Sequence, residues 1–386
     1  MSTEPLRVLM VAARYLPDMG GIETHIDEVS RRLAKSSDFE ITVLATDRTR
    51  SRPRREVIDG VSVLRVPAWP SNRDYYLAPG IASVVGQRGR WDVVHCQGIH
   101  TPVPVLAMLT ARRARTPYVV TFHTGGHTLA HRNSLRALQW RAIGPLLRNA
   151  ASLAAVSRFE ANTLSAQARL DGKPITVIRN GGTLPPPVPG TQVIPGRIVS
   201  PGRLERYKGH HRVIEALPQV IRGNPDAHLV IIGGGQYEAE LWKFAERHGV
   251  TDRVTITELP PADREAMATA LAQASVVAAM SDYESQGIAV TEALSVGRPV
   301  VGCDIAAIGE LVAQGLVQGV PPEASSSTIA EQLLKAMSAP MPTTRPELPT
   351  WDTAAQELAE LYLSTAGRCS NLRARVSPSS SVHSGA

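Results

Sequence analysis

The chain has 386 residues, which is long for one domain and enough for two. Its 43% hydrophobic and 20% charged content is that of an ordinary globular protein, and no apolar run approaches the roughly 20 residues of a membrane-spanning helix. The apolar run at the start is also too short and interrupted for a signal peptide. Three scattered cysteines without metal-site spacing favour a reducing compartment, so we expect a cytoplasmic protein.

The net charge of +6 is unevenly distributed. Residues 1–190 carry 25 Lys/Arg and 14 Asp/Glu (+11), whereas residues 191–386 carry 16 and 21 (−5). A basic first half can attract an anionic substrate or a membrane surface, although a solvated surface explains the charge equally well. The arginine-rich segment 48–55 has no interleaved aromatic residues, which disfavours nucleic-acid binding and predicts an exposed, mobile loop.

Strands and helices alternate along the chain, which predicts an α/β fold with parallel sheets. The first strand, within 6–13, is followed by Gly20-Gly21 and then by an amphipathic helix. Paired glycines let the backbone approach a ligand closely, and a helix start favours a phosphate or sugar oxygen. The alternative is a tight turn that needs glycine only for a positive φ.

Further strands are expected at 41–45, 91–95 and 117–122, and the last of these leads directly into His123. A histidine at the carboxyl end of a strand is well placed to contact a substrate. The alternative is a loop histidine that bonds the backbone.

An amphipathic helix is predicted over 135–147, with arginines around its polar side. A core-facing helix with a solvated face is favoured over contact with a membrane or a lipid-linked acceptor. Strands follow at 152–156 and 175–178, separated by a capping box that begins at Ser157. The second strand ends at Asn180-Gly181-Gly182.

The proline-rich stretch 184–196 is the natural linker to a second α/β unit. After the strand at 197–200, the loop 202–209 places Arg203 and Lys208 between glycines, just before a helix. Both cations suit a diphosphate, although a basic surface turn would look the same.

The rest of the second unit is predicted from its apolar runs. Strands are expected at 228–232, 254–256, 275–279 and 299–303, then a loop at 304–310, a last helix at 353–364 and a disordered Ser-rich tail. The glycine turn at 233–235 lacks the complete dinucleotide fingerprint, so a dehydrogenase is not favoured.

Two carboxylates, Glu284 and Glu292, are separated by seven residues that include Gly287. The first lies in the loop after a buried strand, and the second lies in the helix that begins there. In an open parallel sheet this loop is where ligands bind. The alternative is an exposed loop acid beside an ordinary surface-helix acid.

Taken together, these pieces resemble the retaining glycosyltransferases of family 4, over roughly residues 6–363. This family has the GT-B architecture, an α/β fold of two Rossmann-like domains with parallel sheets facing across a cleft. The resemblance rests on the following motifs: Gly20-Gly21, Phe122-His123, Ala155-Val156-Ser157, Asn180-Gly181, Gly202-Arg203-Leu204 with Lys208-Gly209, Gly233-Gly234-Gly235, Glu284 with Glu292, and Trp351-Asp352.

The resemblance implies a role for each of these positions. Arg203 and Lys208 would hold the nucleotide diphosphate, Glu284 would face the donor sugar and Glu292 would bind the ribose hydroxyls. His123 would contact the donor sugar. The backbones of Gly20, Gly21, Gly287 and Ile288 would approach the phosphates, and Asn180 and Gly181 would line the cleft.

The resemblance also implies a domain division. Residues 1–184, with a closing helix at 351–364, would form the acceptor-side domain, and residues 185–350 would form the nucleotide-sugar domain. Residues 365–386 would be the disordered tail.

The expected activity is transfer of a sugar from a UDP- or GDP-sugar with retention of configuration. The chain contains no Asp-x-Asp motif, so no metal is expected. The acceptor would be a small molecule, an antibiotic-type compound, or a polysaccharide or lipid-linked glycan, with peripheral membrane contact not required. The alternatives are a nucleotide-sugar epimerase and a non-catalytic nucleotide-sugar-binding protein.

The sequence departs from the family pattern at four places. Gln286 stands where the family usually has Phe, Gly182 replaces a small hydrophobic residue, and 306–310 is an imperfect Gly-Gly-x-x-Glu loop. The segment 315–327 lacks the usual form associated with base recognition.

Overall fold

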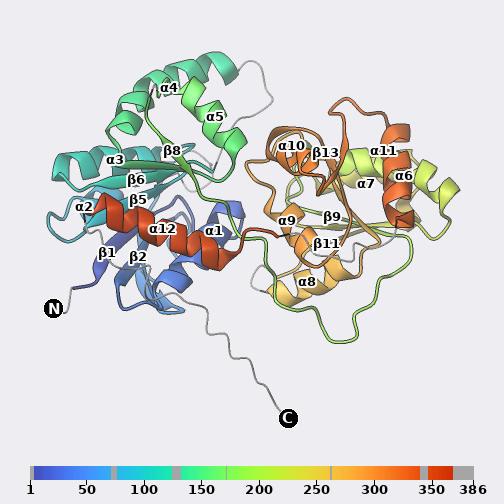
Figure 1. Cartoon of the computed structure of the whole chain (residues 1–386), viewed down its shortest axis with the longest axis horizontal. Coiled ribbons are helices and arrows are strands. Elements are labelled where there is room, and N and C mark those ends of the chain that lie inside the picture. The colour runs from blue at the N-terminus through green and yellow to red at the C-terminus, as the bar shows by residue number, and fades with distance from the viewer. Residues whose placement is uncertain are drawn as a thin grey trace, which may run out of the picture.

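The computed structural model describes residues 4–70, 76–123, 132–170, 172–260, 263–339 and 347–367. Two α/β units lie side by side, each built on its own sheet (Figure 1). Helix α12 near the end of the chain lies against the first unit (Figure 1).

The first sheet has eight strands in the order β3-β4-β2-β1-β5-β6-β7-β8. Its strands are β1 (Leu6–Val11), β2 (Phe39–Asp47), β3 (Arg55–Ile58), β4 (Val61–Pro67), β5 (Val93–Gln97), β6 (Tyr118–Thr121), β7 (Ser152–Ala155) and β8 (Ile175–Val177). All neighbours are parallel except β3 and β4, which pair antiparallel at the edge. The central strands are buried along almost their whole length, as expected for parallel strands covered on both faces.

The second sheet has six strands in the order β11-β10-β9-β12-β13-β14, and all neighbours are parallel. Its strands are β9 (Arg197–Pro201), β10 (His228–Ile232), β11 (Val254–Thr257), β12 (Val276–Ala279), β13 (Val300–Cys303) and β14 (Gln318–Val320). The strand order reverses between β9 and β12. The loops after these two strands therefore lie at a topological switch point, where open α/β sheets bind ligands.

Helices connect the strands in both units. In the first they are α1 (Gly21–Leu33), α2 (Gly80–Val85), α3 (Pro102–Ala114), α4 (Arg132–Asn149) and α5 (Arg158–Gln167). In the second they are α6 (His210–Gly223), α7 (Glu238–Arg247), α8 (Arg264–Ala272), α9 (Ile288–Ser295), α10 (Ala306–Ala313) and α11 (Ser326–Ser338), with short 3-10 turns η1 (Arg206–Lys208) and η2 (Thr251–Arg253).

Helix α12 (Trp351–Thr365) returns from the second unit to the first. Its buried face joins the core beneath β1 and β2, and the Tyr362 hydroxyl lies 2.5 Å from His95 Nδ1. Arg32 of α1 donates to Asp352 over 2.5 Å. The closing helix expected from the sequence thus packs on the first unit.

The structure corrects three expectations about local structure. The arginine-rich segment is exposed for the most part, but Arg52 forms a two-pronged ion pair with Asp18, with N–O distances of 3.0 and 2.8 Å. Arg55 already belongs to the antiparallel strand β3, so the first sheet is not wholly parallel. The expected loop 304–310 is helical from Ala306, where α10 begins.

Other expectations are confirmed or lie outside the described residues. Ser157 Oγ accepts from the Glu160 N–H, as the capping box predicted. Helix α12 extends through Thr365, and the predicted tail beyond 367 lies outside the described residues. Among the described helices, none combines the length and apolar character needed to cross a membrane.

Candidate active site

Two loops of the second unit meet at the switch point. The Asp282 N–H, after β12, donates to the Tyr207 carbonyl oxygen, after β9, over 2.7 Å. Gly209 has a positive φ of 72°, and a Cβ on it would lie 1.9 Å from the Met280 carbonyl oxygen. Because only glycine permits that approach, Gly209 brings the two loops together.

This contact sets Lys208 against Glu284. Lys208 Nζ lies 2.6 Å from Glu284 Oε1, and the Ser281 hydroxyl donates to the same oxygen over 2.9 Å. Burial lowers the pKa of Lys208, but the Glu284 carboxylate and Tyr207 together outweigh burial and raise it above its ordinary value. Lys208 is therefore a cation at neutral pH, and its three donors allow it to bind Glu284 and a phosphate oxygen at once.

Arg203 lies near this pair, in the same loop after β9. The Leu204 N–H donates to the Gly234 carbonyl over 2.9 Å, so the glycine turn after β10 supports the Arg203 loop. The Arg203 side chain is 52% exposed, lies 2.6 Å from Glu205 Oε1 and donates to the Tyr207 hydroxyl over 2.8 Å. Its guanidinium is available to solvent and to a ligand.

The glycine pair of the first unit lies close to these residues. Gly20 is extended, with φ −167°, and Gly21 opens α1, so the alternative of a positive-φ turn is wrong. A Cβ on Gly21 would lie 3.9 Å from Ile288 Cδ1, at the start of α9. The starts of α1 and α9 therefore meet where the two units face each other.

A buried acid, Glu23, stands behind the glycine pair. A Cβ on Gly20 would lie 2.7 Å from Glu23 Oε2, and Arg14 Nε lies 3.2 Å from Glu23 Oε1. Burial raises the pKa of Glu23, while the charges of Arg14 and Arg203 lower it. The Glu23 carboxyl group therefore interacts electrostatically with Arg203 of the opposite unit.

His123 lies at the end of β6, with φ 55°, and its Nε2 is 2.7 Å from Gln97 Oε1. His123 thus bonds a side chain, and not the backbone as the alternative interpretation of a loop histidine expected. Its ring packs edge-on against His25 at a centroid distance of 4.6 Å, and His25 Nδ1 lies 2.6 Å from Asn180 Oδ1. Burial places the pKa of His123 well below its ordinary value, so this imidazole is neutral at pH 7.

Asn180 and Gly181 lie where the chain crosses between units. The Asn180 N–H donates to Gln286 Oε1 over 2.6 Å, and Gln286 Nε2 donates to the Asn180 carbonyl over 2.7 Å. A Cβ on Gly181 would lie 2.2 Å from the Trp351 nitrogen, so the outgoing and returning chains touch here. Gln286, the residue that departs from the family pattern, thus joins the two units.

Glu292 occupies a separate environment from Lys208 and Glu284. It is buried in α9 and forms an ion pair with Arg264 of α8. Burial raises its pKa to about 7, and Arg264 opposes that shift.

The side chain of Glu310, in the second unit, contacts the first unit. It accepts from the Phe159 N–H and lies 3.7 Å from Arg179, both in the first unit. Residues of both units line a cavity here: Val156, Ser157, Arg179, Gln286, Thr291 and Glu310 among them.

The structure thus brings most of the proposed residues to one region and adds others. Glu23, His25 and Gln97 were missed because in the sequence they look like polar positions on a helix face or a strand. The available signal was position: Glu23 and His25 lie two and four residues after Gly21, and Gln97 ends a strand. Within the described ranges, no group of three His, Cys, Asp or Glu side chains could hold a metal ion.

Residues 19–182 match the model of Glycosyltransferase Family 4, and residues 192–349 match that of Glycosyl transferases group 1. The chain is 30% identical to D-inositol 3-phosphate glycosyltransferase of Xylanimonas cellulosilytica, with 92% of this chain and 96% of the relative covered. It is 26% identical to GDP-mannose:cellobiosyl-diphosphopolyprenol alpha-mannosyltransferase of Xanthomonas campestris, over 78% and 79%.

Among solved structures, Anabaena HepE in complex with UDP and glucose superposes with a TM-score of 0.68 at 19% identity. The superposition covers 96% of this chain and 100% of that one, and at this identity it shows the shared fold. The chain belongs to the GT-B glycosyltransferases of family 4.

Proposed function

We propose that the protein is a retaining glycosyltransferase that takes its sugar from a UDP- or GDP-sugar without a metal ion. The observation that carries the proposal is the Lys208–Glu284 pair at the switch point, with Arg203 beside it and the start of α1 opposite. The second unit, residues 185–350, would bind the donor, and residues 1–184 with α12 would bind the acceptor. We also propose a cytoplasmic location, which the sparse cysteines support.

The chemistry of the leaving group explains these residues. Breaking the sugar–phosphate C–O bond places negative charge on the diphosphate. Fixed cations and N–H donors aimed at such a charge each contribute about 10²–10³ in rate. Arg203 and Lys208 would supply the cations, and the N–H groups of Gly20, Gly21, Gly287 and Ile288 would supply the neutral donors.

Retention would follow from attack on the same face of the sugar that the diphosphate leaves. The acceptor hydroxyl forms the new C–O bond, the bond to the phosphate breaks, and the leaving phosphate oxygen takes the hydroxyl proton. Glu284 would orient the sugar and Glu292 the ribose, while neutral His123 would contact the sugar. No carboxylate nucleophile is needed.

The relatives support a nucleotide sugar and leave the base open. HepE is in complex with UDP and glucose, and the Xanthomonas campestris relative is named for GDP-mannose and a diphosphopolyprenol acceptor. We accordingly propose a hydroxyl acceptor on a small molecule, an antibiotic-type compound, or a polysaccharide or lipid-linked glycan.

A thermal-shift panel of UDP, GDP, ADP and TDP tests the donor assignment, because a ligand that binds the native state raises its melting temperature. One nucleotide should stabilise the protein clearly more than the others. The matching radiolabelled sugar should then be transferred, with the anomeric configuration of the product read by NMR. Absence of a shift with all four nucleotides would contradict the proposal.

The same assay separates the alternatives. An epimerase would convert the nucleotide sugar with no acceptor present, and a binding protein would give the thermal shift without turnover.

Turnover should be unchanged in excess EDTA, because Arg203 and Lys208 carry the charge that a metal would otherwise supply. The activity of a sample dialysed against EDTA, with and without added Mg²⁺ or Mn²⁺, measures this. A loss of activity that Mg²⁺ restores would show that a metal takes part.

A further inference from the structure

An apolar pocket of about 560 Å³ opens in the first unit, between α2, α3 and α4. Its walls are aliphatic: Leu77, Ala78, Pro79, Ala82, Pro102, Val105, Leu106, Leu109, Ala142 and Ile143. The volume lies in the range of small-molecule sites, roughly 300–1,000 Å³. None of the residues considered above in the donor site lines it.

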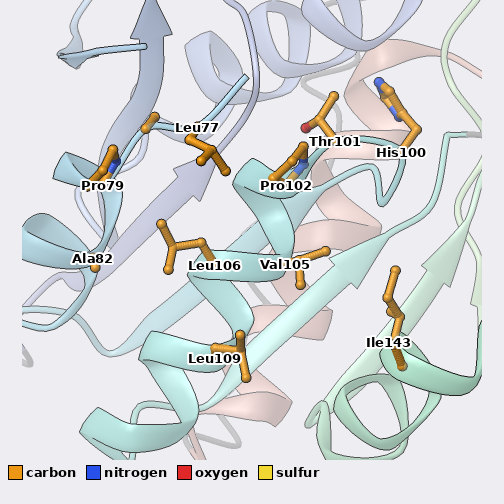
Figure 2. A pocket seen from close by; sticks show the side chains of 12 residues that line it. Leu77, Pro79, Ala82, His100, Thr101, Pro102, Val105, Leu106, Leu109 and Ile143 are labelled. Carbon is orange, nitrogen blue, oxygen red and sulfur yellow. The ribbon is translucent and has the colours of Figure 1, made fainter. Parts of the chain in front are cut away.

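The pocket has one polar end. Figure 2 shows His100 and Thr101 at one end, Val105 and Leu106 along the middle, and Leu109 with Ile143 at the other end. Thr101 is the N-cap residue of α3, yet its side chain makes no capping bond. Its buried Oγ1 has no hydrogen-bond partner among the described residues, and a buried hydroxyl normally has one.

The polar end lies beside the carboxyl ends of β5 and β6. His100 follows β5, and its ring carbon Cε1 would lie 3.1 Å from a Cβ on Gly98. The Gly98 N–H donates to the Thr121 carbonyl over 2.7 Å, two residues before His123. Burial is the main cause that lowers the pKa of His123, and the charge of His100 contributes to the same shift.

The rim of the pocket is apolar as well. Leu77 is 58% exposed, and Trp69, which pairs with it in an isolated β-bridge, is 67% exposed. These two exposed side chains extend the apolar surface of the pocket outward from Leu77. Apart from His100 and Thr101, the described residues of the lining are Leu, Val, Ile, Ala and Pro, with no Phe, Tyr or Trp among them, which suits a flexible aliphatic chain better than a stacked aromatic ring.

We infer that this pocket binds an aliphatic chain, alkyl or isoprenoid, on the acceptor, and that His100 and Thr101 contact the polar group that joins the chain to the reacting hydroxyl. The inference rests on the proposed function and narrows its acceptor to an amphiphile. The chain would lie between α2, α3 and α4 while the hydroxyl faces His123.

Titration calorimetry with methyl, n-hexyl and n-octyl β-D-glucopyranoside, each below its micelle concentration, tests this on the full chain. Each buried methylene contributes about 0.8 kcal/mol, or roughly fourfold in affinity, so n-octyl should bind at least tenfold more tightly than n-hexyl, one molecule per chain. Equal affinity for methyl and n-octyl glucoside would overturn the inference.

Two variants locate the binding. Ala142→Trp fills the pocket from an exposed position on α4, and Leu106→Asp places a charge in its wall. Both should abolish the dependence on chain length, whereas Val57→Asp, at a 71% exposed apolar position on β3, should keep it. Equal chain-length dependence in all three variants would place the chain elsewhere.

A second readout does not depend on the folding of any variant. An n-octyl glucoside with a terminal diazirine should label peptides of α3 and α4 on illumination, and labelling confined to other peptides would contradict the assignment.

The thermal shift with UDP or GDP should be the same in Ala142→Trp as in the unmodified protein. In the unmodified protein, absence of chain-length-dependent binding with intact sugar transfer would overturn this inference alone, whereas absence of transfer would overturn the proposed function.

Discussion

Arg203 and Lys208 differ in how the fold holds them. Lys208 is fixed at 2.6 Å from Glu284 and its side chain is 16% exposed, whereas Arg203 is 52% exposed at the mouth of the same loop. Lys208 is therefore preorganised, and Arg203 can close on a ligand. Both residue types were evident in the sequence, but their approach to Glu284 depends on the backbone contact at Gly209.

Replacing either cation should slow the reaction. We expect Arg203→Ala and Lys208→Ala each to lower turnover at least 10²-fold, because each removes a charge aimed at the leaving diphosphate. Far-UV circular dichroism should show an intact fold. Lys243→Ala, which removes a 61% exposed lysine of α7, is the matched control and should keep full turnover. Near-normal rates in both site variants would count against the diphosphate assignment.

The buried histidines tie stability to pH. Burial lowers the pKa of His25 to about 4 and that of His95 to about 3. The unfolded chain binds protons at these residues below about pH 6.5, whereas the folded chain does not. Their contribution to stability is thus fully present above pH 6.5 and is lost as the pH falls toward 4.

A substitution isolates one of these residues. Between pH 7 and pH 5, His25 should account for about 2 kcal/mol of lost unfolding free energy. In urea titrations at the two pH values, the unfolding free energy of His25→Asn should fall by about 2 kcal/mol less than that of the unmodified protein. An unchanged pH dependence in His25→Asn would mean that the residue titrates normally.

At the scale of elements, the two units are joined where α9, the chain after β8 and the start of α12 meet. Gln286 bonds both backbone groups of Asn180, and the Asn180 side chain bonds His25. The donor-side loop and the histidines of the first unit are therefore linked through one residue. The sequence showed that Gln286 was unusual for the family, but it could not show a contact between residues 106 positions apart.

Gln286→Leu should weaken this junction. It leaves the Asn180 N–H and C=O buried without partners, each at a cost of about 1–3 kcal/mol, so we expect a loss of roughly 2–6 kcal/mol in urea unfolding. Gln356→Leu, on the exposed side of α12, is the control and should change stability little. Equal stability of the two variants would show that water replaces the Gln286 contacts.

Elements with strong apolar patterns were predicted well, and those governed by distant contacts were not. The central strands β1, β5 and β6 are rich in apolar residues because helices cover both faces, which made them easy to find. The β3–β4 hairpin was missed because Arg55 and its neighbours look like a charged loop. Arg65 of β4 is buried only because it pairs with Glu56 and donates to the Leu16 carbonyl, contacts that no local pattern reveals.

At the scale of the whole molecule, the ligand-facing loops of two sheets point at each other. The start of α1, with Gly20 and Gly21, meets the start of α9, with Gly287 and Ile288, and Arg203 of one unit influences Glu23 of the other. The motif order in the sequence predicted this architecture, because carboxyl ends of parallel strands gather at one edge of each sheet. The apolar pocket between α2, α3 and α4 was not predicted, since it depends on the relative positions of three helices, which a local sequence pattern does not reveal.

The central claim is that Arg203 and Lys208 hold the diphosphate of the donor. Titration calorimetry with the preferred nucleoside diphosphate and with its bare nucleoside, on the unmodified protein and on Lys208→Ala, tests it most directly. The account predicts that Lys208→Ala weakens diphosphate binding at least tenfold and leaves nucleoside binding unchanged. Equal weakening of both ligands, or of neither, would contradict it.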